Sequence, residues 1–316
     1  MSGTPRGTGT ERRTAMTRIG VVGAGKVGAV LAARLRDAGH QVVAAAGESS
    51  ASRARAAALL AGVPLLKPTD VARSCDLLML TVPDDMLGNV VATLADAGAL
   101  HEGQVVLHTS GRHGLAVLEP ARRVGARVLA LHPAMTFTGT SLDLPRLSGC
   151  VLGAAADTDE TRALVQSLAA DLEGRLVWVA EERRALYHAA LAHGANHLVT
   201  LVAEARELLD AAGIEDPAGT LRPLLTAALD NALEHGDAAL TGPIVRGDVQ
   251  TVAAHLEQVA THSPAALPSY VALARATADR AVLDGRLLPI RRASLVALLD
   301  AAEAGAHRAA TGGEVR

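Results

Sequence analysis

Short runs of apolar residues alternate with stretches of helical spacing through the first half of the chain. The runs lie at residues 18–23, 41–46, 76–82, 104–110, 126–133, 150–155 and 175–180. Parallel strands that are covered by helices on both faces have this continuous apolar character. Strands that alternate with helices predict an α/β domain built on a doubly wound, mostly parallel sheet.

The pattern changes after Val179, where no further apolar run of this kind interrupts the helical spacing. Helices are expected over residues 181–212 and 217–235, then from Val249, from Pro264 and from Ser294 to about Ala304, with Gly213 and Gly305 as stops. Between them, residues 239–248 ("ALTGPIVRGD") are expected to form a loop in which Asp248 caps the next helix. We therefore predict a disordered tail over residues 1–16, an α/β domain over 17–180 and an all-helical domain over 181–312.

Composition narrows the class of protein. The chain has 316 residues, a formal charge of −3 and 49% hydrophobic residues, enough for two domains with separate cores. The near-neutral charge gives no electrostatic basis for binding nucleic acid or a membrane surface, and 1% aromatic residues argues against base-stacking platforms. Residues 1–16 lack the apolar segment of a signal peptide, and no window is apolar enough for a membrane span. Two cysteines without disulfide or metal spacing favour a cytoplasmic protein.

A glycine motif, "GVVGAGKVG", follows the first predicted strand and opens the first predicted helix. Gly23 permits a tight turn, Gly25 lets the backbone approach a pyrophosphate, and Gly28 lets helix and strand pack closely. The helix N-terminus adds free N–H groups and a positive dipole end. This context predicts a Rossmann-type dinucleotide site that includes Ala24, Lys26 and Val27; the alternative is a glycine turn without a ligand.

The loop after the second strand, "AAAGESSASR", bears on the choice between NAD and NADP. Glu48 is a candidate to hold the ribose hydroxyls of NAD, unless it is simply solvated. Ser49 and Arg53, with Ser50 and Ser52, are candidates to surround the 2′-phosphate of NADP. We expect NADP, with NAD as the alternative.

Polar residues also end three later strands. "TVPDD" places Val82, Pro83 and Asp84 at the carboxyl edge of the sheet, where ligands bind, although Asp84 or Asp85 has the alternative role of capping the next helix. "LHTSG" places Thr109 and Ser110 at the same edge, and "LHPAMTF" places His132 there. His132 is a candidate to orient or protonate a substrate; the alternative is a structural histidine bonded to a loop carbonyl.

The long helix predicted over residues 181–212 has a polar stripe. At about 100° per residue, His188, Ala192, Asn196 and Thr200 share one face, which suits a small ligand, a solvent face or a close helix contact. His193 and His197 are four residues apart, but no third ligand accompanies them, so no metal is expected.

These motifs, together with "YHAALAHGANHLVTL" and "ALTGPIVRGD", resemble the Rossmann-like proteins that have a C-terminal domain of unknown function 2520. That family is similar to the 6-phosphogluconate and β-hydroxyacid dehydrogenase superfamily, whose relatives include ketopantoate reductase and pyrroline-5-carboxylate reductase. The resemblance implies a nicotinamide-dependent oxidoreductase, more often with NADP, and a homodimer formed through the helical domain.

The chain departs from the superfamily at one position. β-Hydroxyacid dehydrogenases have a catalytic lysine one turn before an asparagine. Here Asn196 is present, but the residue one turn before it is Ala192. His188, His132 or a water would then supply the proton.

Thr241, Arg246 and Asp248 are expected to face the cleft between the two domains, with Thr241 and Arg246 as candidate substrate-binding residues. Arg246 is a candidate to pair with a substrate carboxylate; the alternative is that Arg246 and Asp248 only brace the loop.

The sequence therefore predicts an enzyme, an NAD(P)-dependent reductase of a C=O or C=N group in a small, carboxylate-bearing substrate such as the 2-oxo acid ketopantoate. The candidate catalytic residues are His188, Asn196, His132 and Ser110. The alternative is a cofactor-binding sensor or scaffold without turnover, which the missing lysine favours.

Overall fold

The structure is a computed structural model that describes residues 16–312. The tail expected over residues 1–16 lies outside this range except for Met16. The chain divides into two compact units, Met1–Ala195 and Asn196–Arg316.

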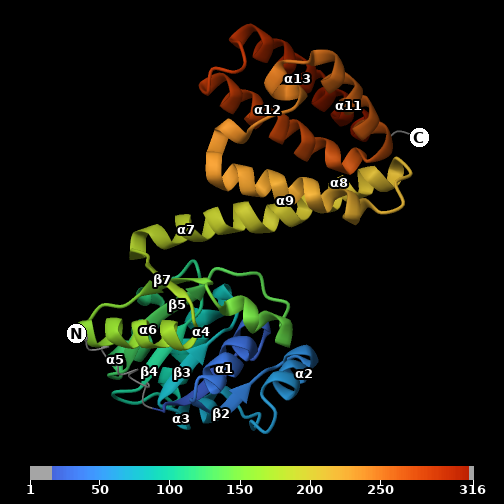
Figure 1. The fold of residues 1–316 in the computed structure, drawn as a ribbon. Helices are drawn as coiled ribbons and strands as arrows, with labels where there is room; N and C mark the ends of the chain where they lie inside the picture. Colours follow the sequence, from blue (N-terminus) through green and yellow to red (C-terminus); the bar gives the residue numbers. More distant parts are fainter. Residues whose placement is uncertain (1–15, 313–316) are drawn as a thin grey trace, which may run out of the picture. The chain divides into compact units, whose positions relative to one another are not determined.

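The first unit is built on a seven-stranded sheet with helices on both faces (Figure 1). The strand order is β2-β1-β3-β4-β5-β6-β7, and all neighbours are parallel except β5 and β6. The strands are β1 (Arg18–Val22), β2 (Gln41–Ala46), β3 (Leu77–Leu80), β4 (Val105–His108), β5 (Arg127–Pro133), β6 (Val151–Ala155) and β7 (Arg175–Trp178). The predicted α/β class with a mostly parallel sheet is confirmed.

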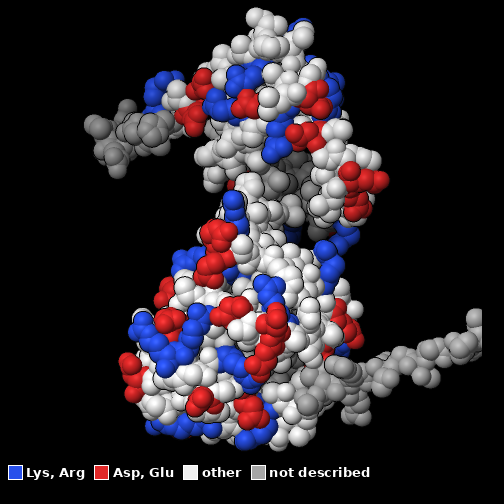
Figure 2. All heavy atoms as spheres, turned by 90° about the vertical axis from the view of Figure 1, so that its left-hand side faces the viewer, with Lys and Arg blue, Asp and Glu red and all other residues white. Residues whose placement is uncertain are grey.

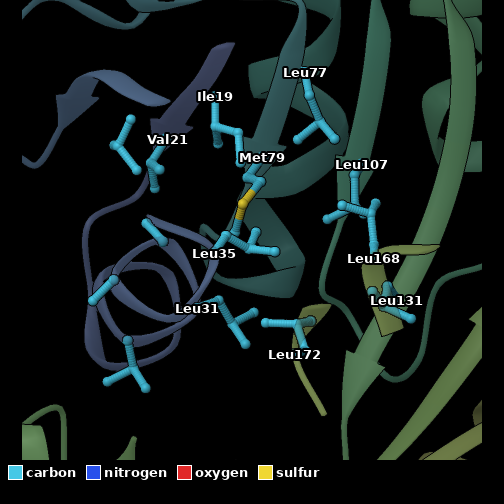
Figure 3. Packing of buried hydrophobic residues seen from close by; sticks show 14 of the residues in the cluster. Ile19, Val21, Leu31, Leu35, Leu77, Met79, Leu107, Leu131, Leu168 and Leu172 are labelled. Atoms are coloured by element: carbon cyan, nitrogen blue, oxygen red, sulfur yellow. The ribbon is translucent and has the colours of Figure 1, made fainter. Parts of the chain in front are cut away.

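Successive strand residues face opposite sides of this sheet, and a separate hydrophobic core covers each side. Figure 3 shows one side, where Ile19 and Met79 meet Leu35 of α1. The other side packs Leu78 and Leu80 against helices that include α4. The helices of the unit are α1 (Lys26–Asp37), α2 (Ser50–Leu59), α3 (Pro68–Arg73), α4 (Asp84–Asp96), α5 (Glu119–Arg123), α6 (Asp159–Asp171) and α7 (Arg184–Leu191).

The antiparallel step between β5 and β6 follows from the connection between them. A parallel neighbour needs a crossover segment, usually a helix, but this connection contains only the 3₁₀ turns η2 (Ser141–Asp143) and η3 (Pro145–Leu147). Asp143 is fully buried at its centre and accepts hydrogen bonds from the Thr138 hydroxyl and the Gly139 amide. The loop therefore folds back on itself.

The single helix expected over residues 181–212 is interrupted. A 3₁₀ turn, η4 (Glu181–Arg183), precedes α7, and a π-helical turn (Ala192–Asn196) joins α7 to α8 (His197–Ala211). A π turn adds a residue to the helical repeat, so the expected stripe from His188 to Thr200 does not stay on one regular face. The first compact unit runs to Ala195 and so includes α7, which makes hydrogen bonds to Ser110 and His132. The domain boundary near residue 180 stays a prediction.

The second unit is helical. Its α-helices are α8, α9 (Pro217–His235), α10 (Pro243–Arg246), α11 (Val249–His262), α12 (Leu267–Leu283) and α13 (Pro289–Gly312), with short 3₁₀ turns η6 (Gly236–Ala239) and η7 (Pro264–Ala266). Their core contains Val252, Leu256, Val271, Leu295 and Leu299.

Two sequence expectations for this unit are wrong and one is confirmed. The loop expected over 239–248 contains the short helix α10, which begins at Pro243 and ends at Gly247 with φ of 69°. The last helix begins at Pro289, where proline suits a first turn, and continues past Gly305, because a glycine inside a helix costs only about 1 kcal/mol. Asp248 caps α11 as expected, accepting from the Thr251 amide at 3.2 Å.

The surface shows charges of both signs. On the face in Figure 2, acidic and basic side chains are interspersed over each unit. No helix among the described residues has the length and apolarity that a membrane crossing requires. Cys75 is buried, Cys150 is half-buried, and both are free thiols. A cytoplasmic location stays a prediction.

Two glycines of the glycine motif should differ in what they contribute to stability. A Cβ atom at Gly28 would lie 2.2 Å from Thr81 Oγ1 and 2.5 Å from the Gly23 carbonyl oxygen, whereas the nearest such atom at Gly25 is 3.8 Å away. We expect Gly28→Ala to lower the free energy of unfolding by about 1–3 kcal/mol, and Gly25→Ala to change it by less than about 0.5 kcal/mol. Urea unfolding followed by circular dichroism measures both. Equal losses in the two variants would contradict the packing described here.

Candidate active site

The glycine loop is pinned between the ends of two strands. The amides of Gly23 and Ala24 donate to the Ala46 carbonyl at the end of β2, at 3.0 and 2.8 Å. The Thr81 hydroxyl, just after β3, donates to the Gly23 carbonyl at 2.6 Å. Gly23 has φ of 99°, a conformation that favours glycine. The loop is therefore rigidly placed before α1 begins.

The face of the loop at Gly25 opens on a groove. A side chain at this position would meet little of the protein, and no side chain caps α1. The adjoining cavity has a volume of about 640 Å³, within the usual range for small-molecule sites. Its lining includes Gly23, Gly25, Glu48, Ser49, Arg53, Val82 and Pro83, all predicted from the sequence.

Other predicted cofactor residues do not line this cavity. Ala24 and Gly28 are buried beneath the loop, and Lys26 and Val27 begin α1. Asp84 occupies the first turn of α4 and has no side-chain capping bond, while its carbonyl is 3.1 Å from His113 Nε2. Thr109 continues the β4 ladder through its amide.

The cavity has a further wall that the sequence analysis missed, made by Leu65, Leu66, Lys67, Pro68 and Met86. Most of this wall belongs to the connection between α2 and α3. Leu65 forms an isolated parallel bridge with Ala45 of β2, which holds the connection beside the sheet. An apolar "PLLKP" stretch was the available signal, but it has neither strand length nor helical period.

The loop after β2 combines a helix start with an exposed cation. Ser49 caps α2 by accepting from the Ser52 amide at 3.0 Å, and the Ser52 hydroxyl donates to the Ser49 carbonyl at 2.8 Å. The Arg53 guanidinium donates to the Glu48 carbonyl. Glu48, Ser49 and Arg53 are exposed at the cavity, whereas Ser52 is buried. A positive side chain next to a helix N-terminus suits an anionic group.

A second group of polar residues lies at the ends of β4 and β5. His108, the last residue of β4, is fully buried, with Nε2 2.8 Å from the Gly114 carbonyl and Nδ1 3.1 Å from the Ser110 amide nitrogen. These partners require a neutral ring with its proton on Nε2. Burial lowers the pKa of His108 to about 4, in agreement with that form. His108 therefore holds both ends of the turn that presents Ser110.

The Ser110 hydroxyl can still donate a hydrogen bond. Its Oγ accepts from the His113 amide at 3.1 Å, and its own carbonyl accepts from Arg184 Nη2 at 2.8 Å. A hydroxyl that accepts in this way keeps its O–H proton for donation to another group. Ser110 was predicted, but Arg184, His108 and His113 were not.

His132 lies at the end of β5 beside the first residues of α7. Its Nδ1 is 3.1 Å from Tyr187 Oη, and its ring makes edge contacts with Tyr187 and His188 at centroid distances of 5.6 and 5.8 Å. Burial, with the charges of His188 and Arg184, lowers the pKa of His132 to about 4. The ring is therefore neutral at pH 7.

Two glycines make room for this cluster. A Cβ atom at Gly111 would lie 2.6 Å from His188 Cδ2 and 2.9 Å from His132 Nε2, and one at Gly153 would lie 2.5 Å from Tyr187 Oη. The structure thus brings Gly111, His132, Tyr187 and His188 together. Burial raises the pKa of Tyr187. The chain has only two tyrosines, which was the one sequence signal for this residue.

The remaining predicted residues belong to the second unit. Asn196 and Arg246 are exposed, and Thr241 lines a cavity of about 360 Å³ together with Glu204, Tyr270 and apolar residues of that unit. Among the described residues, no group of three or more His, Cys, Asp or Glu side chains is arranged to hold a metal ion.

Two family models match the chain. A Rossmann-like domain matches residues 1–133, and the domain of unknown function DUF2520 matches residues 150–277. A search of the curated proteins finds no match.

Solved structures extend the likeness to most of the chain. The putative NADP oxidoreductase BF3122 from Bacteroides fragilis is 22% identical, with a TM-score of 0.73 over 84% of this chain and 98% of that one. Protein TM1727 from Thermotoga maritima is 20% identical, with a TM-score of 0.58 over 83% and 98%. An imine reductase from Pseudomonas sp. is 18% identical, with a TM-score of 0.56 over 92% and 95%. At these identities the likeness establishes the fold, and with the two family models it confirms the predicted resemblance. The chain therefore contains a region that matches a Rossmann-like domain, followed by a region that matches the DUF2520 domain.

Proposed function

We propose that this protein is an NAD(P)-dependent oxidoreductase that reduces a C=O or C=N group of a small molecule, with NADPH as the preferred cofactor. The observation on which this depends is the glycine loop, whose face at Gly25 opens on a cavity of about 640 Å³ with Arg53 among its lining residues. The structural neighbours support it, since their names include an NADP oxidoreductase, an imine reductase and a pyrroline carboxylate reductase with NADP bound.

The residues of the first unit fit a dinucleotide. Backbone amides of the Gly23–Gly28 loop would hold the pyrophosphate at the N-terminus of α1. Arg53 and Ser49 would bind the 2′-phosphate of NADP, and Val82 and Pro83 give the cavity an apolar wall for the nicotinamide end. The bound cofactor supplies the hydride, and the protein orients the substrate and supplies the proton.

Our first prediction for this site concerns cofactor choice. We expect NADPH to bind more tightly than NADH in a fluorescence titration, because Arg53 is a cation that can pair with the 2′-phosphate. Arg53→Ala should weaken NADPH binding by roughly tenfold or more and leave NADH binding nearly unchanged. Gly25→Ala should weaken both, because its methyl group enters the cofactor's side of the loop. Tight binding of NADH alone would reassign the loop to Glu48, and binding of neither would remove the oxidoreductase proposal.

The His132–Tyr187 pair is the best-placed proton source in the first unit. The raised pKa of Tyr187 keeps its hydroxyl protonated at neutral pH, whereas the His132 ring is neutral with a pKa of about 4. With its proton on Nδ1, His132 donates to Tyr187 Oη and leaves the phenolic proton free for the product oxygen or nitrogen. The Ser110 hydroxyl would orient the same group. His188, which the sequence analysis gave as a possible donor beside His132, contacts the His132 ring and stays the alternative.

Replacement of the phenol tests this role. With a panel of 2-oxo acids and cyclic imines, we expect Tyr187→Phe to lower kcat by about 10²-fold or more with NADPH affinity unchanged. Tyr270→Phe is a matched control, because Tyr270 Oη also contacts a histidine, His255, at 2.9 Å, but in the second unit. In the native enzyme kcat should fall as the pH rises through the Tyr187 pKa, since the donor loses its proton. Unchanged turnover in Tyr187→Phe would return the role to His188.

The alternative function is a cofactor-binding sensor or scaffold. The observation that favours it is the lack of a lysine on α7 and α8, where the superfamily has its catalytic one. If NADPH binds tightly and no member of the panel is reduced, this alternative is preferred.

We further propose that the helical unit forms a homodimer. Helix α8 has no buried residue, and large apolar side chains are exposed along α8 and α9: Leu198, Val199, Leu201, Leu224, Leu229 and Leu233. Apolar surface of this extent usually marks a protein interface. A second copy of the same chain would cover it with the same side chains.

A charge placed on this surface should dissociate the dimer. Leu233 is 78% exposed on α9, and Leu283 is 87% exposed at the end of α12. We expect Leu233→Asp to convert the dimer to monomer in light scattering after size exclusion, and Leu283→Asp to leave it intact. A monomeric native protein, or dissociation by Leu283→Asp alone, would contradict this interface.

A further inference from the structure

The first residue of α7, Arg184, has a fully buried guanidinium with few partners. Its relative exposure is 0%. Nη2 donates to the Ser110 carbonyl at 2.8 Å, but Nε and Nη1 have no hydrogen-bond partner within the described part of the chain. Removing a charge from water is costly unless opposite charges and hydrogen bonds compensate for it. A sequence selected for stability alone gains nothing from this arrangement.

Two carboxylates lie near enough to favour the charge of Arg184, yet neither is hydrogen-bonded to it. Glu181 accepts from the amides of Leu115 and Ala116, at 2.7 and 3.3 Å. Asp84 lies in the first turn of α4. Both raise the pKa of Arg184, while burial lowers it more strongly. The charge is therefore only partly compensated and acts on neighbouring groups through a medium of low polarity.

The charge of Arg184 changes the pKa of two residues of the candidate active site, Tyr187 and His132. Arg184 lies three residues before Tyr187 and four before His188, so the three share a face of α7. Burial raises the pKa of Tyr187, Arg184 opposes that rise, and the Cys150 thiol adds slightly to it. At His132, burial lowers the pKa most, the charges of His188 and then Arg184 lower it further, and Asp84 raises it.

Arg184 also sets the position of the Ser110 turn. Its bond to the Ser110 carbonyl joins α7 to the turn, and the next residue, Gly111, packs against His132 and His188. One side chain thus contacts the turn that presents a hydroxyl and lies beside the phenol that presents a proton.

We propose that Arg184 is a positioning residue for the proposed reduction: it fixes the Ser110 turn against α7 and stabilises the phenolate that Tyr187 becomes when its proton leaves. The proton passes from Tyr187 Oη to the product oxygen or nitrogen, and the negative charge left on Oη is balanced by the guanidinium. The inference rests on the proposed function for its chemistry, but the electrostatic coupling that it requires is measurable without a substrate.

The test is the ionisation of Tyr187 in the full-length protein. With ¹³Cζ-labelled tyrosine the chain gives two resonances, and Tyr270→Phe identifies them. We expect Arg184→Gln to raise the Tyr187 pKa by roughly one unit relative to the native protein, because an opposite charge at close range is lost. Arg183→Gln is the matched control, since it removes the same charge from the exposed preceding residue and should leave the pKa unchanged. Equal Tyr187 pKa values in the two variants would overturn the proposal.

Arg184→Lys keeps the charge and loses the planar contact with Ser110. We expect its Tyr187 pKa to stay near the native value while kcat falls and NADPH affinity is retained. A Tyr187 pKa raised by roughly one unit in Arg184→Lys relative to the native protein would mean that side-chain shape, and not charge, controls Tyr187, which also overturns the proposal. Since the reference is the native protein, this measurement applies even if Arg184→Gln does not fold.

The two proposals fail in different ways. If no substrate of the panel is reduced but Arg184→Gln shifts the Tyr187 pKa, the coupling stands and the reductase proposal falls. If substrates are reduced and the pKa is the same in all variants, Arg184 is a structural brace and only this inference falls.

Discussion

Polar groups buried at the carboxyl edge of the sheet must find partners inside the protein, and this requirement shapes the candidate site. Strands β1, β3, β4 and β5 all end at that edge. The turn after β4 meets this requirement with side chains: the buried His108 makes hydrogen bonds at both of its ends, and the exposed Glu181 accepts from the amides of Leu115 and Ala116 just beyond it. A turn held in this way keeps Ser110 in one orientation.

Arg184 is the exception to that requirement, and the exception is informative. Most buried polar atoms near it are satisfied, whereas two of its nitrogens are not. Stability and function are commonly opposed at such positions, because a charge that is costly in the resting protein becomes favourable when an opposite charge forms nearby. The only hydroxyl on its helix face that can become such a charge is that of Tyr187.

The sequence was sufficient for features that depend on local pattern. Continuous apolar runs predicted the strands, and the spacing of Gly23, Gly25 and Gly28 predicted the loop, because both follow from backbone geometry over a few residues. Features that depend on distant contacts were not accessible. The π turn at Ala192–Asn196 broke a stripe that a regular helix would have kept, and nothing in residues 184–187 shows that Arg184 and Tyr187 face strands β4 and β5. His132 could be identified as a candidate from its residue type and its place at the end of a strand. Its protonation state could not, because the His188 and Arg184 side chains that lower its pKa lie more than 50 residues away in sequence.

A tyrosine hydrogen-bonded to a histidine is not in itself a catalytic device, and this chain contains its own comparison. Tyr187 and Tyr270 each contact a histidine Nδ1, at 3.1 and 2.9 Å, and burial raises the pKa of both. They differ in their surroundings: Tyr187 has a buried guanidinium that opposes the rise, whereas burial is the one cause acting on Tyr270. A proton donor must hold its proton at rest and release it during the reaction, which needs both influences at once. We therefore propose that in this chain two residues take the place of the superfamily's lysine: the phenol of Tyr187 donates the proton, and the guanidinium of Arg184 stabilises the phenolate that remains.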